Sequence, residues 1–273
     1  MTLFSALTAA RQKIDRIDAR LLLQYATGCS HTDLLARPET PVSSAAYTQF
    51  AAWVERRTAG EPLAYLVGET EFRGRVFQVS PAVLIPRPET EMLIDLALEK
   101  LRGMAAPKVL DLGTGSGIVA ILLALECPAG TVVAVDLAKE AISTARTNAG
   151  RLGAQVDFRH GDWFAPVAGE RFDLIVSNPP YIVDGDPHLA LDGLPFEPRM
   201  ALTDGAAGGD GLACIRHIVA EAAAHLLPGG WLLFEHGYDQ GAASRNLLTH
   251  AGFKAASTHP DLAGIDRVSG GHL

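Results

Sequence analysis

The chain has 273 residues, 48% of them hydrophobic, which is enough to bury the cores of one large and one small domain and excludes a disordered chain. Lys and Arg total 23 against 31 Asp and Glu, and this net charge of −8 argues against broad electrostatic capture of a nucleic-acid backbone, although it leaves room for a local basic patch. The cysteines lack CxxC spacing, so we expect neither a disulfide framework nor a metal site. No basic leader opens the chain, and no apolar run reaches the ~20 residues of a membrane span. We therefore expect a cytoplasmic protein that does not insert into a membrane.

Apolar residues recur at helical spacing near the start of the chain, as at Leu3, Leu7 and Ile14. The pattern returns after Ser43, a residue type that caps helices well. Residues 1–65 are therefore predicted to form a small helical domain. This part of the chain contains no recognisable catalytic motif, so we expect it to help dock a substrate.

Residues 66–88 are rich in β-favouring side chains interrupted by glycine and proline, which predicts a β-hairpin linker. Residues 89–273 then alternate between amphipathic stretches and short apolar runs. We expect strands at residues 108–112, 131–135, 156–159, 172–177 and 231–235, and helices at 89–101, after 117, at 139–151 and at 214–226. Buried strands separated by helices predict an α/β fold, a doubly wound and mainly parallel sheet of the Rossmann-like kind.

A glycine-rich loop follows the first of these strands and leads directly into a helix. Its residues are Gly113, Thr114, Gly115, Ser116 and Gly117. Glycines let a ligand approach the backbone amides at a helix N-terminus. A dinucleotide-binding GxGxxG loop would have its third glycine at the position of Ile118, one residue later than here, so the spacing favours S-adenosylmethionine. A tight turn that needs glycine for packing alone is the structural alternative.

Two further strand ends carry side chains suited to an adenosine. Asp136 follows the second strand roughly 20 residues beyond the glycine loop, where an acid accepts hydrogen bonds from ribose hydroxyls. The third strand leads to Asp162, an acceptor for an adenine amino group, and to Trp163, an aromatic surface beside the ring. Considered singly, Asp136 is equally a capping residue and Trp163 equally a core side chain.

The fourth strand ends in the most informative tetrapeptide of the chain, Asn178-Pro179-Pro180-Tyr181. The carboxyl ends of successive parallel strands meet at one edge of the sheet, which is where open α/β sheets bind ligands. Structural requirements alone are a poor explanation for four such segments at the ends of successive strands. We therefore predict that they form one cofactor and substrate site.

The loop suits the methylation of a planar nitrogen. The lone pair of a glutamine amide or an adenine amino group is delocalised and attacks a methyl sulfonium poorly, whereas acceptors aimed at both N–H hydrogens would localise it and stabilise the developing positive charge. We expect the side-chain oxygen of Asn178 and the carbonyl of Pro179 to be these acceptors, on a turn that the prolines stiffen. Tyr181 would offer a flat face to the substrate.

A hydrolytic site receives less support from the sequence. Ser177, Glu235 and His236 stand at predicted strand ends, but no GxSxG or HExxH motif accompanies them. We expect core or surface roles for all three residues.

Taken together and in order, these segments closely resemble the HemK family of peptide chain release factor glutamine methyltransferases, over nearly the whole chain. The segments that carry the resemblance are Tyr65-Leu66-Val67-Gly68 with Phe72, Leu84-Ile85-Pro86-Arg87-Pro88-Glu89-Thr90-Glu91, the loop from Asp111 to Gly117, Asp162-Trp163-Phe164, Val176-Ser177-Asn178-Pro179-Pro180-Tyr181-Ile182 and Phe196-Glu197-Pro198-Arg199-Met200-Ala201-Leu202. The family resemblance implies a helical N-terminal domain, a β-hairpin linker and a C-terminal catalytic domain.

The resemblance also implies roles for the site residues. The glycine loop, Asp136 and Trp163 would hold S-adenosylmethionine, while Asp162 is assigned to the adenine by position. The tetrapeptide would hold the glutamine of a Gly-Gly-Gln loop in a release factor, with Asn178 also near the cofactor methyl group. The resemblance also includes Arg87, Glu91 and Glu197, whose roles we leave open. The structural alternatives for these residues are that they lie at the start of a helix or hold a loop in place.

Two other functions compete with this interpretation. Enzymes that methylate adenine or guanine amino groups in nucleic acid share the NPPY loop, but the extended resemblance and the acidic net charge favour a protein substrate, and we expect no stable nucleic-acid binding. A binding module that has kept the cofactor and lost catalysis is the second alternative. The intact Asn178 and Pro179 argue against it.

Overall fold

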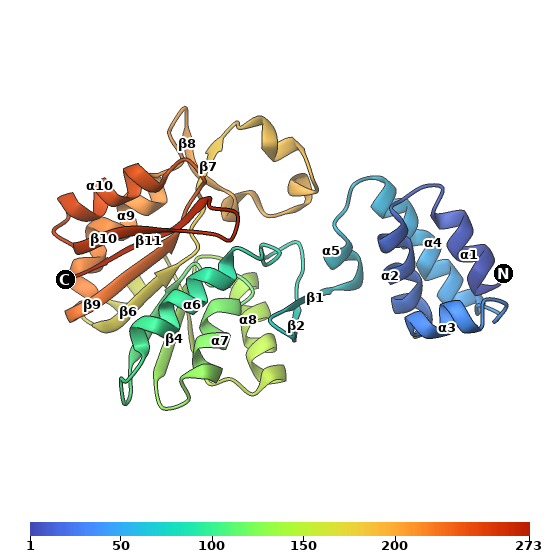
Figure 1. The fold of residues 1–273 in the computed structure, drawn as a ribbon, viewed down its shortest axis with the longest axis horizontal. Coiled ribbons are helices and arrows are strands. Elements are labelled where there is room, and N and C mark those ends of the chain that lie inside the picture. Colours follow the sequence, from blue (N-terminus) through green and yellow to red (C-terminus); the bar gives the residue numbers. More distant parts are fainter. The chain divides into compact units, whose positions relative to one another are not determined.

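The computed structural model describes residues 1–273, apart from the side chain of Ala207, and the chain divides into two compact units. Unit 1 consists of Met1–Glu69 and Ala190–Phe196, and unit 2 of Thr70–Leu189 and Glu197–Leu273 (Figure 1). The chain therefore leaves unit 2 after Leu189, contributes a short segment to unit 1 and returns at Glu197.

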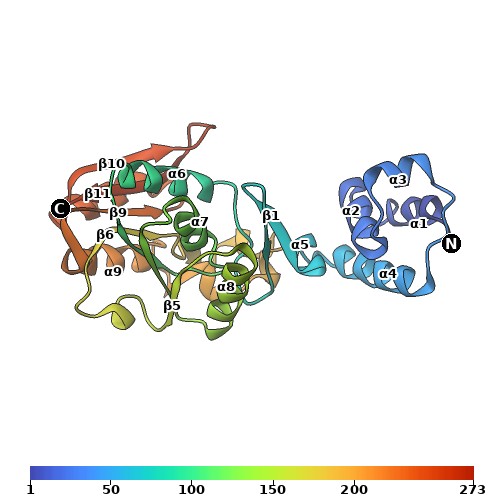
Figure 2. The same ribbon diagram turned by 90° about the horizontal axis from the view of Figure 1, so that it is seen from below.

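Unit 1 is helical, as the sequence predicts. Its helices are α1 (Leu3–Ala10), α2 (Arg16–Thr27), α3 (His31–Ala36), α4 (Ser44–Thr58) and α5 (Leu63–Val67). Figure 2 shows α1 to α4 grouped together, and their apolar faces share one buried cluster that includes Leu22 and Phe50. Local capping sets the helix starts: Thr2 forms a capping box with Ser5 at α1, and the Ser43 hydroxyl accepts from the amide of Ala46 at α4.

Unit 2 is built on a seven-stranded sheet in the order β10-β11-β9-β6-β3-β4-β5. The strands are β3 (Lys108–Leu112), β4 (Thr131–Asp136), β5 (Asp157–His160), β6 (Phe172–Ser177), β9 (Leu226–Glu235), β10 (Lys254–Pro260) and β11 (Asp266–His272). The pairs β4–β5, β3–β4, β3–β6 and β6–β9 are parallel, whereas β11 runs antiparallel to both of its neighbours. The predicted α/β fold with a mainly parallel sheet is confirmed.

Helices cover both faces of this sheet (Figure 1). The bounds of these helices are α6 (Thr90–Leu101), α7 (Ile118–Glu126), α8 (Lys139–Leu152), α9 (Ala213–Ala222) and α10 (Gly241–His250). Alternate strand residues serve different cores, because Val109 packs with α6, α7 and α8 while Leu110 packs with α9 and α10. In the whole described chain, no helix is both long and apolar enough to cross a membrane.

Two small sheets complete the architecture. One pairs β1 (Glu69–Phe72) with β2 (Arg75–Gln78), and the other pairs β7 (Ile182–Asp184) with β8 (Thr203–Ala207). Single turns of 3-10 helix lie at Ala165–Val167, Pro187–Ala190, Leu194–Phe196, Arg199–Ala201 and Ala223–His225. Strand β7 begins directly after the NPPY loop, residues 178–181. In the chain, β7 and β8 flank the segment Ala190–Phe196, which belongs to unit 1.

The hairpin of β10 and β11 and the helix α10 are not expected from the sequence pattern. A side-chain Cβ at Gly270 would lie 2.4 Å from Leu233 Cδ2 and 2.6 Å from the Leu232 carbonyl oxygen, so β11 needs a glycine there in order to pair with β9. Glycines inside a strand look like turn signals in a sequence, and this hides β11 from pattern analysis.

Asn148 of α8 ties the β2 strand to the glycine loop. Its side-chain oxygen accepts from the amide of Gln78 at 2.7 Å, and its amide nitrogen donates to the carbonyls of Gln78 at 3.0 Å and Ser116 at 2.9 Å. The Asn148 side chain is fully buried, and these three bonds satisfy its polar atoms.

We predict that Asn148→Ala lowers the free energy of unfolding by about 3 kcal/mol, because it removes three hydrogen bonds of a buried side chain and leaves the buried Ser116 carbonyl without this partner. Urea denaturation measures this loss. The matched control is Thr147→Ala, which removes an exposed hydroxyl that bonds only to its own helix at Ser143. An equal loss in the two variants would show that the cross-link contributes nothing.

Candidate active site

The strand ends that carry the predicted site residues meet at one edge of the sheet. Leu112, the last residue of β3, is paired with Val135 of β4 on one side and with Ser177 of β6 on the other. The Ser177 hydroxyl also donates to the Leu112 carbonyl at 2.8 Å. The glycine loop and the NPPY loop therefore leave the sheet at the same level.

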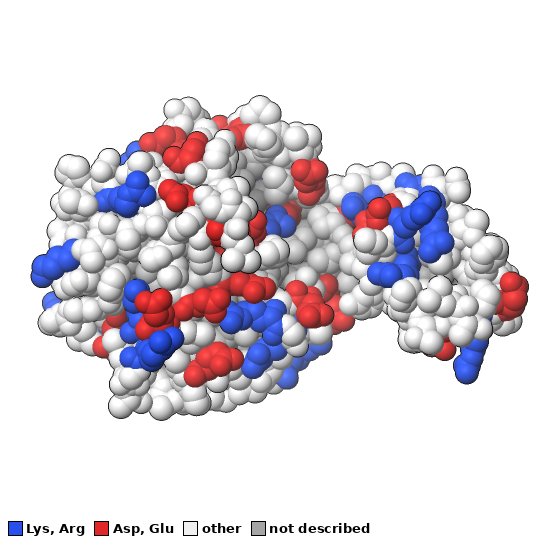
Figure 3. Space-filling view, in the orientation of Figure 1, with Lys and Arg blue, Asp and Glu red and all other residues white. Residues whose placement is uncertain are grey.

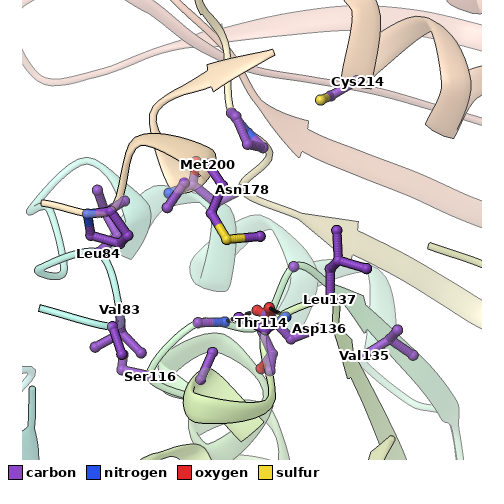
Figure 4. A pocket seen from close by; sticks show the side chains of 18 of the residues that line it. Val83, Leu84, Thr114, Ser116, Val135, Asp136, Leu137, Asn178, Met200 and Cys214 are labelled. Atoms are coloured by element: carbon purple, nitrogen blue, oxygen red, sulfur yellow. Dashed lines mark hydrogen bonds between the residues drawn. The ribbon is translucent and has the colours of Figure 1, made fainter. Parts of the chain in front are cut away.

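A cavity of about 630 Å³ opens at this edge, entirely within unit 2. The predicted residues that line it are Gly113, Thr114, Gly115, Ser116, Asp136, Asp162, Trp163, Asn178 and Pro180. In the close-up of Figure 4, Asn178 and Met200 face Thr114 and Asp136 across the cavity, with Val83 and Leu84 on a third side. In the described residues, Gly117, Pro179 and Tyr181 are not part of the lining.

The glycine loop turns back on itself through left-handed backbone angles. The φ angles are 71° at Gly113, 54° at Gly115 and 84° at Gly117, a region that side chains rarely adopt. At Gly117 a Cβ would come within 2.9 Å of both Ala145 and Ile121. Packing of α7 against α8 thus explains this glycine, and its contact with the cofactor stays a prediction.

Asp136 holds the glycine loop as well as the cavity wall. Its Oδ2 accepts from the amide of Gly115 at 2.8 Å, and its Oδ1 accepts from the amide of Ala138 at 2.8 Å. Burial raises the pKa of Asp136, and these two hydrogen bonds oppose the shift. Each carboxylate oxygen accepts two or more hydrogen bonds, so Asp136 keeps capacity for the hydroxyls of a ribose. Leu137, whose side chain is 53% exposed at the cavity lip, adds an apolar surface.

Asp111 also lines the cavity, although the sequence pattern assigns it no role of its own. Its side chain is only 1% exposed and accepts from the Thr114 hydroxyl at 2.7 Å. Burial, with a smaller contribution from Asp136, raises the pKa of Asp111 to about 7. A cavity floor with two carboxyls fits a cationic ligand, and S-adenosylmethionine carries both an ammonium and a sulfonium. A lone acid inside an apolar strand was the available signal.

Asp162 and Trp163 follow β5 at the far side of the cavity. Trp163 has a left-handed φ of 36°, and its ring lies 6.1 Å from that of His217 of α9. The same wall includes Cys214, whose pKa burial raises to about 11, so its thiol is uncharged. Aromatic and weakly polar groups of this kind suit a flat purine.

The NPPY loop is connected to a chain of buried hydrogen bonds. Asn178 Nδ2 donates to Thr90 Oγ1 at 3.1 Å, and Thr90 Oγ1 donates to Glu235 Oε2 at 2.8 Å. The Tyr181 hydroxyl donates to the other oxygen of Glu235 at 3.2 Å. Tyr181 packs against the core beneath the loop, and its assignment as the flat face of the substrate site stays a prediction.

Glu235 is 1% exposed, at the carboxyl end of β9. Burial raises its pKa to about 7; the hydroxyls of Thr90 and Tyr181 lower it, Glu89 raises it further and Arg267 of β11 lowers it. Burial likewise raises the pKa of Tyr181. The sequence suggested only a core or surface role for Glu235, and its partners lie too far away along the chain to be recognised from a motif.

Two further anchors hold the loops around the cavity. Glu197 is buried, accepts from the amide of Ile85 at 3.0 Å and forms an ion pair with Arg87. Gln240 donates to the Tyr181 carbonyl at 3.0 Å. Arg87 also lines the cavity, so the Glu197 carboxylate stiffens the cavity wall.

Glu91, the third residue left open by the sequence, is exposed in the first turn of α6, where an acid complements the helix dipole. The residues considered for hydrolysis are also accounted for. His236 bonds to the Gly237 carbonyl and the Ser269 hydroxyl, and Ser177 bonds to Leu112. Burial lowers the pKa of His236, which favours a neutral structural histidine.

Comparison with known families assigns most of the chain. Residues 2–68 match the family model described as PrmC N-terminal domain, and residues 90–192 match the methyltransferase small domain. The chain is 50% identical over 264 residues to the release factor glutamine methyltransferase of Bordetella pertussis, covering 95% of this chain and 96% of the relative. It is also 50% identical to the enzyme of that name from Burkholderia pseudomallei, covering 95% and 93%.

Solved structures with lower identity share the fold. A 16S rRNA guanine N2 methyltransferase of T. thermophilus, solved with S-adenosylmethionine and guanosine, has a TM-score of 0.55 at 22% identity and covers 75% of this chain and 49% of its own. A methyltransferase from Pyrococcus furiosus has a TM-score of 0.52 at 19% identity and covers 81% and 96%.

We predict that Asp136→Ala weakens the binding of S-adenosylmethionine at least about 10-fold, because the ribose loses a charged acceptor and the Gly115 amide loses its partner. Isothermal titration calorimetry on the folded variant measures this affinity. Asp157→Ala, an acid at the opposite end of the adjacent strand β5, serves as the control. Unchanged affinity in the Asp136 variant would remove this residue from the cofactor site.

Proposed function

This chain belongs to the release factor glutamine methyltransferase family, and we propose that it methylates the side-chain amide nitrogen of the glutamine in the Gly-Gly-Gln loop of peptide chain release factors. The cofactor is S-adenosylmethionine. The observation that carries the proposal is the fixed amide of Asn178 at the cavity wall, in a chain so similar to these relatives.

When bound, S-adenosylmethionine supplies an electrophilic methyl group on its sulfonium sulfur. Asp111, Asp136 and the glycine loop would hold it at the cavity floor. Asn178 donates its N–H to Thr90, which leaves its side-chain oxygen to accept from the substrate amide. The Pro179 carbonyl would accept the second hydrogen of that amide, on a loop already anchored by Ser177 and Gln240.

No strong base is required, because the nitrogen loses its proton readily once it has been methylated. The residues therefore act by holding the two N–H groups and excluding water. A backbone and an amide oxygen that are already in place need little reorganisation during the reaction.

The charge distribution of unit 2, which contains the cavity, suits a protein substrate better than a nucleic acid. In the face shown in Figure 3, acidic and basic side chains are interspersed over unit 2, and the net charge of the chain is −8. Phosphate binding generally needs a concentrated basic surface. We further propose that unit 1, which spans the residues of the PrmC N-terminal domain, supplies docking surface for the release factor.

The substrate is tested by incubating the enzyme with labelled cofactor and a release factor, DNA or RNA. We expect label on the glutamine of the Gly-Gly-Gln loop alone, and none on a factor in which that glutamine is replaced. A short loop peptide should be labelled less efficiently than the whole factor, because remote docking surface is lost. Labelling of nucleic acid with none on the release factor would overturn the proposal in favour of a nucleic-acid methyltransferase.

We predict that Asn178→Ala slows methyl transfer by roughly 10²- to 10³-fold, the usual effect of deleting one preorganised polar group beside a developing charge. Single-turnover rates at saturating cofactor measure this step. Calorimetry serves as the control, because cofactor affinity should change much less. A near-normal rate in the variant would exclude the proposed role of Asn178.

A further inference from the structure

The hydrogen-bond chain behind Asn178 has a direction that its chemistry fixes. Above its pKa of about 7, Glu235 is a carboxylate that only accepts hydrogen bonds, so it receives one hydrogen from Thr90 and one from Tyr181. The hydroxyl of Thr90 has a single hydrogen and gives it to Glu235. The lone pair of that hydroxyl is then left facing Asn178, at a distance of 3.1 Å.

This direction determines which end of the Asn178 amide points into the cavity. A lone pair on Thr90 accepts from the amide nitrogen of Asn178, as observed. If the amide turned over, its oxygen would face the Thr90 oxygen with no hydrogen between them, and two acceptors in contact repel each other. In the described residues, the side-chain oxygen of Asn178 has no other hydrogen-bond partner, so it is the atom left for the substrate.

We propose that Thr90 and Glu235 are positioning residues for methyl transfer: Glu235 orients the Thr90 hydroxyl, and Thr90 holds Asn178 with its amide oxygen toward the substrate. The inference rests on the proposed function, because it assumes that Asn178 accepts from the substrate amide.

The burial of the two side chains supports this role. Thr90 is 2% exposed and Glu235 1% exposed, so water does not compete for their hydrogen bonds. Both come from regular elements, the first turn of α6 and the end of β9, and these are more rigid supports than a loop. Burying a carboxyl at this position raises its pKa and therefore costs stability, and an apolar side chain would avoid that cost.

The test compares Thr90→Val, which keeps the shape and removes the hydroxyl, with Thr90→Ser, which keeps the hydroxyl. At pH 8, we expect Thr90→Val to lower the single-turnover rate by roughly 10- to 100-fold, as a misplaced catalytic group does, while the cofactor Kd stays within about two-fold. Thr90→Ser should recover most of the rate. Glu235→Met, which removes the acceptor, should resemble Thr90→Val. The matched control is Ser269→Ala, which deletes a buried hydroxyl that bonds to His236 and Thr258.

A double-mutant cycle separates positioning from a direct or a purely structural role. If Thr90 acts through Asn178, adding Thr90→Val to Asn178→Ala should reduce the rate by less than about two-fold. A full additive loss in the double variant, or a normal rate in Thr90→Val alone, would overturn the inference. Should Glu235→Met fail to fold, the Thr90 variants and this cycle still decide the matter.

A spectroscopic measurement needs no substrate. The side-chain amide signal of Asn178, assigned by its loss in Asn178→Ala, should shift in the nitrogen–proton NMR spectrum of Thr90→Val and stay in place in Ser269→Ala. An unchanged signal in Thr90→Val would refute the positioning role. If the wild-type enzyme labels no release factor, the proposed function fails, whereas this signal still tests the hydrogen bond.

Discussion

The parallel pairing of β3 with both β4 and β6 is the constraint on which the site depends. In a parallel ladder the paired residues share one level, so the chain must leave all three strands at the same edge. This register brings the glycine loop, Asp136 and Asn178 around one cavity, although they are distant in sequence. A slip of one residue in β6 would turn the side chains of that strand to the opposite face and shift the NPPY loop relative to the other walls of the cavity.

The loops that leave this edge have little regular structure, and buried polar side chains from other elements hold them instead. Glu197 holds the segment around Ile85 and Arg87, and Gln240 holds the carbonyl of Tyr181. Each anchor is a buried side chain whose polar atoms bond to backbone or charged groups of a partly buried loop. The stability of the unit and the geometry of the site thus depend on the same few contacts.

The sequence predicted the parts of this arrangement that local rules determine. Strand ends, the glycine loop and the order of the α/β elements follow from apolar periodicity and from residue types that permit tight turns. Partners across long separations do not follow from such rules: Thr90 and Glu235 are 145 residues apart, and neither belongs to a recognisable catalytic motif. From the sequence, Glu235 is expected to be a core or surface residue, because an acid at a strand end has no distinctive pattern until its hydrogen-bond donors are known. The β10–β11 hairpin does not follow from the sequence for a related reason, because Gly270 is required by close packing against Leu233, and that contact exists only in the fold.

If Asn178 binds the substrate as proposed, its surroundings also explain why a neutral amide, rather than a carboxylate, would occupy that position. A carboxylate at that position would be the stronger hydrogen-bond acceptor, but beside a methyl sulfonium it would be a competing nucleophile for the same methyl group. The carboxyl of Glu235 is instead set back behind Thr90, with one oxygen engaged by that hydroxyl and the other by Tyr181. Above the pKa of Glu235, its negative charge would polarise the hydrogen-bond chain and strengthen Asn178 as an acceptor, while both of its oxygens are engaged by Thr90 and Tyr181. The Thr90 hydroxyl lies between Asn178 and Glu235, so the carboxylate can act on Asn178 without itself lying beside the methyl sulfonium.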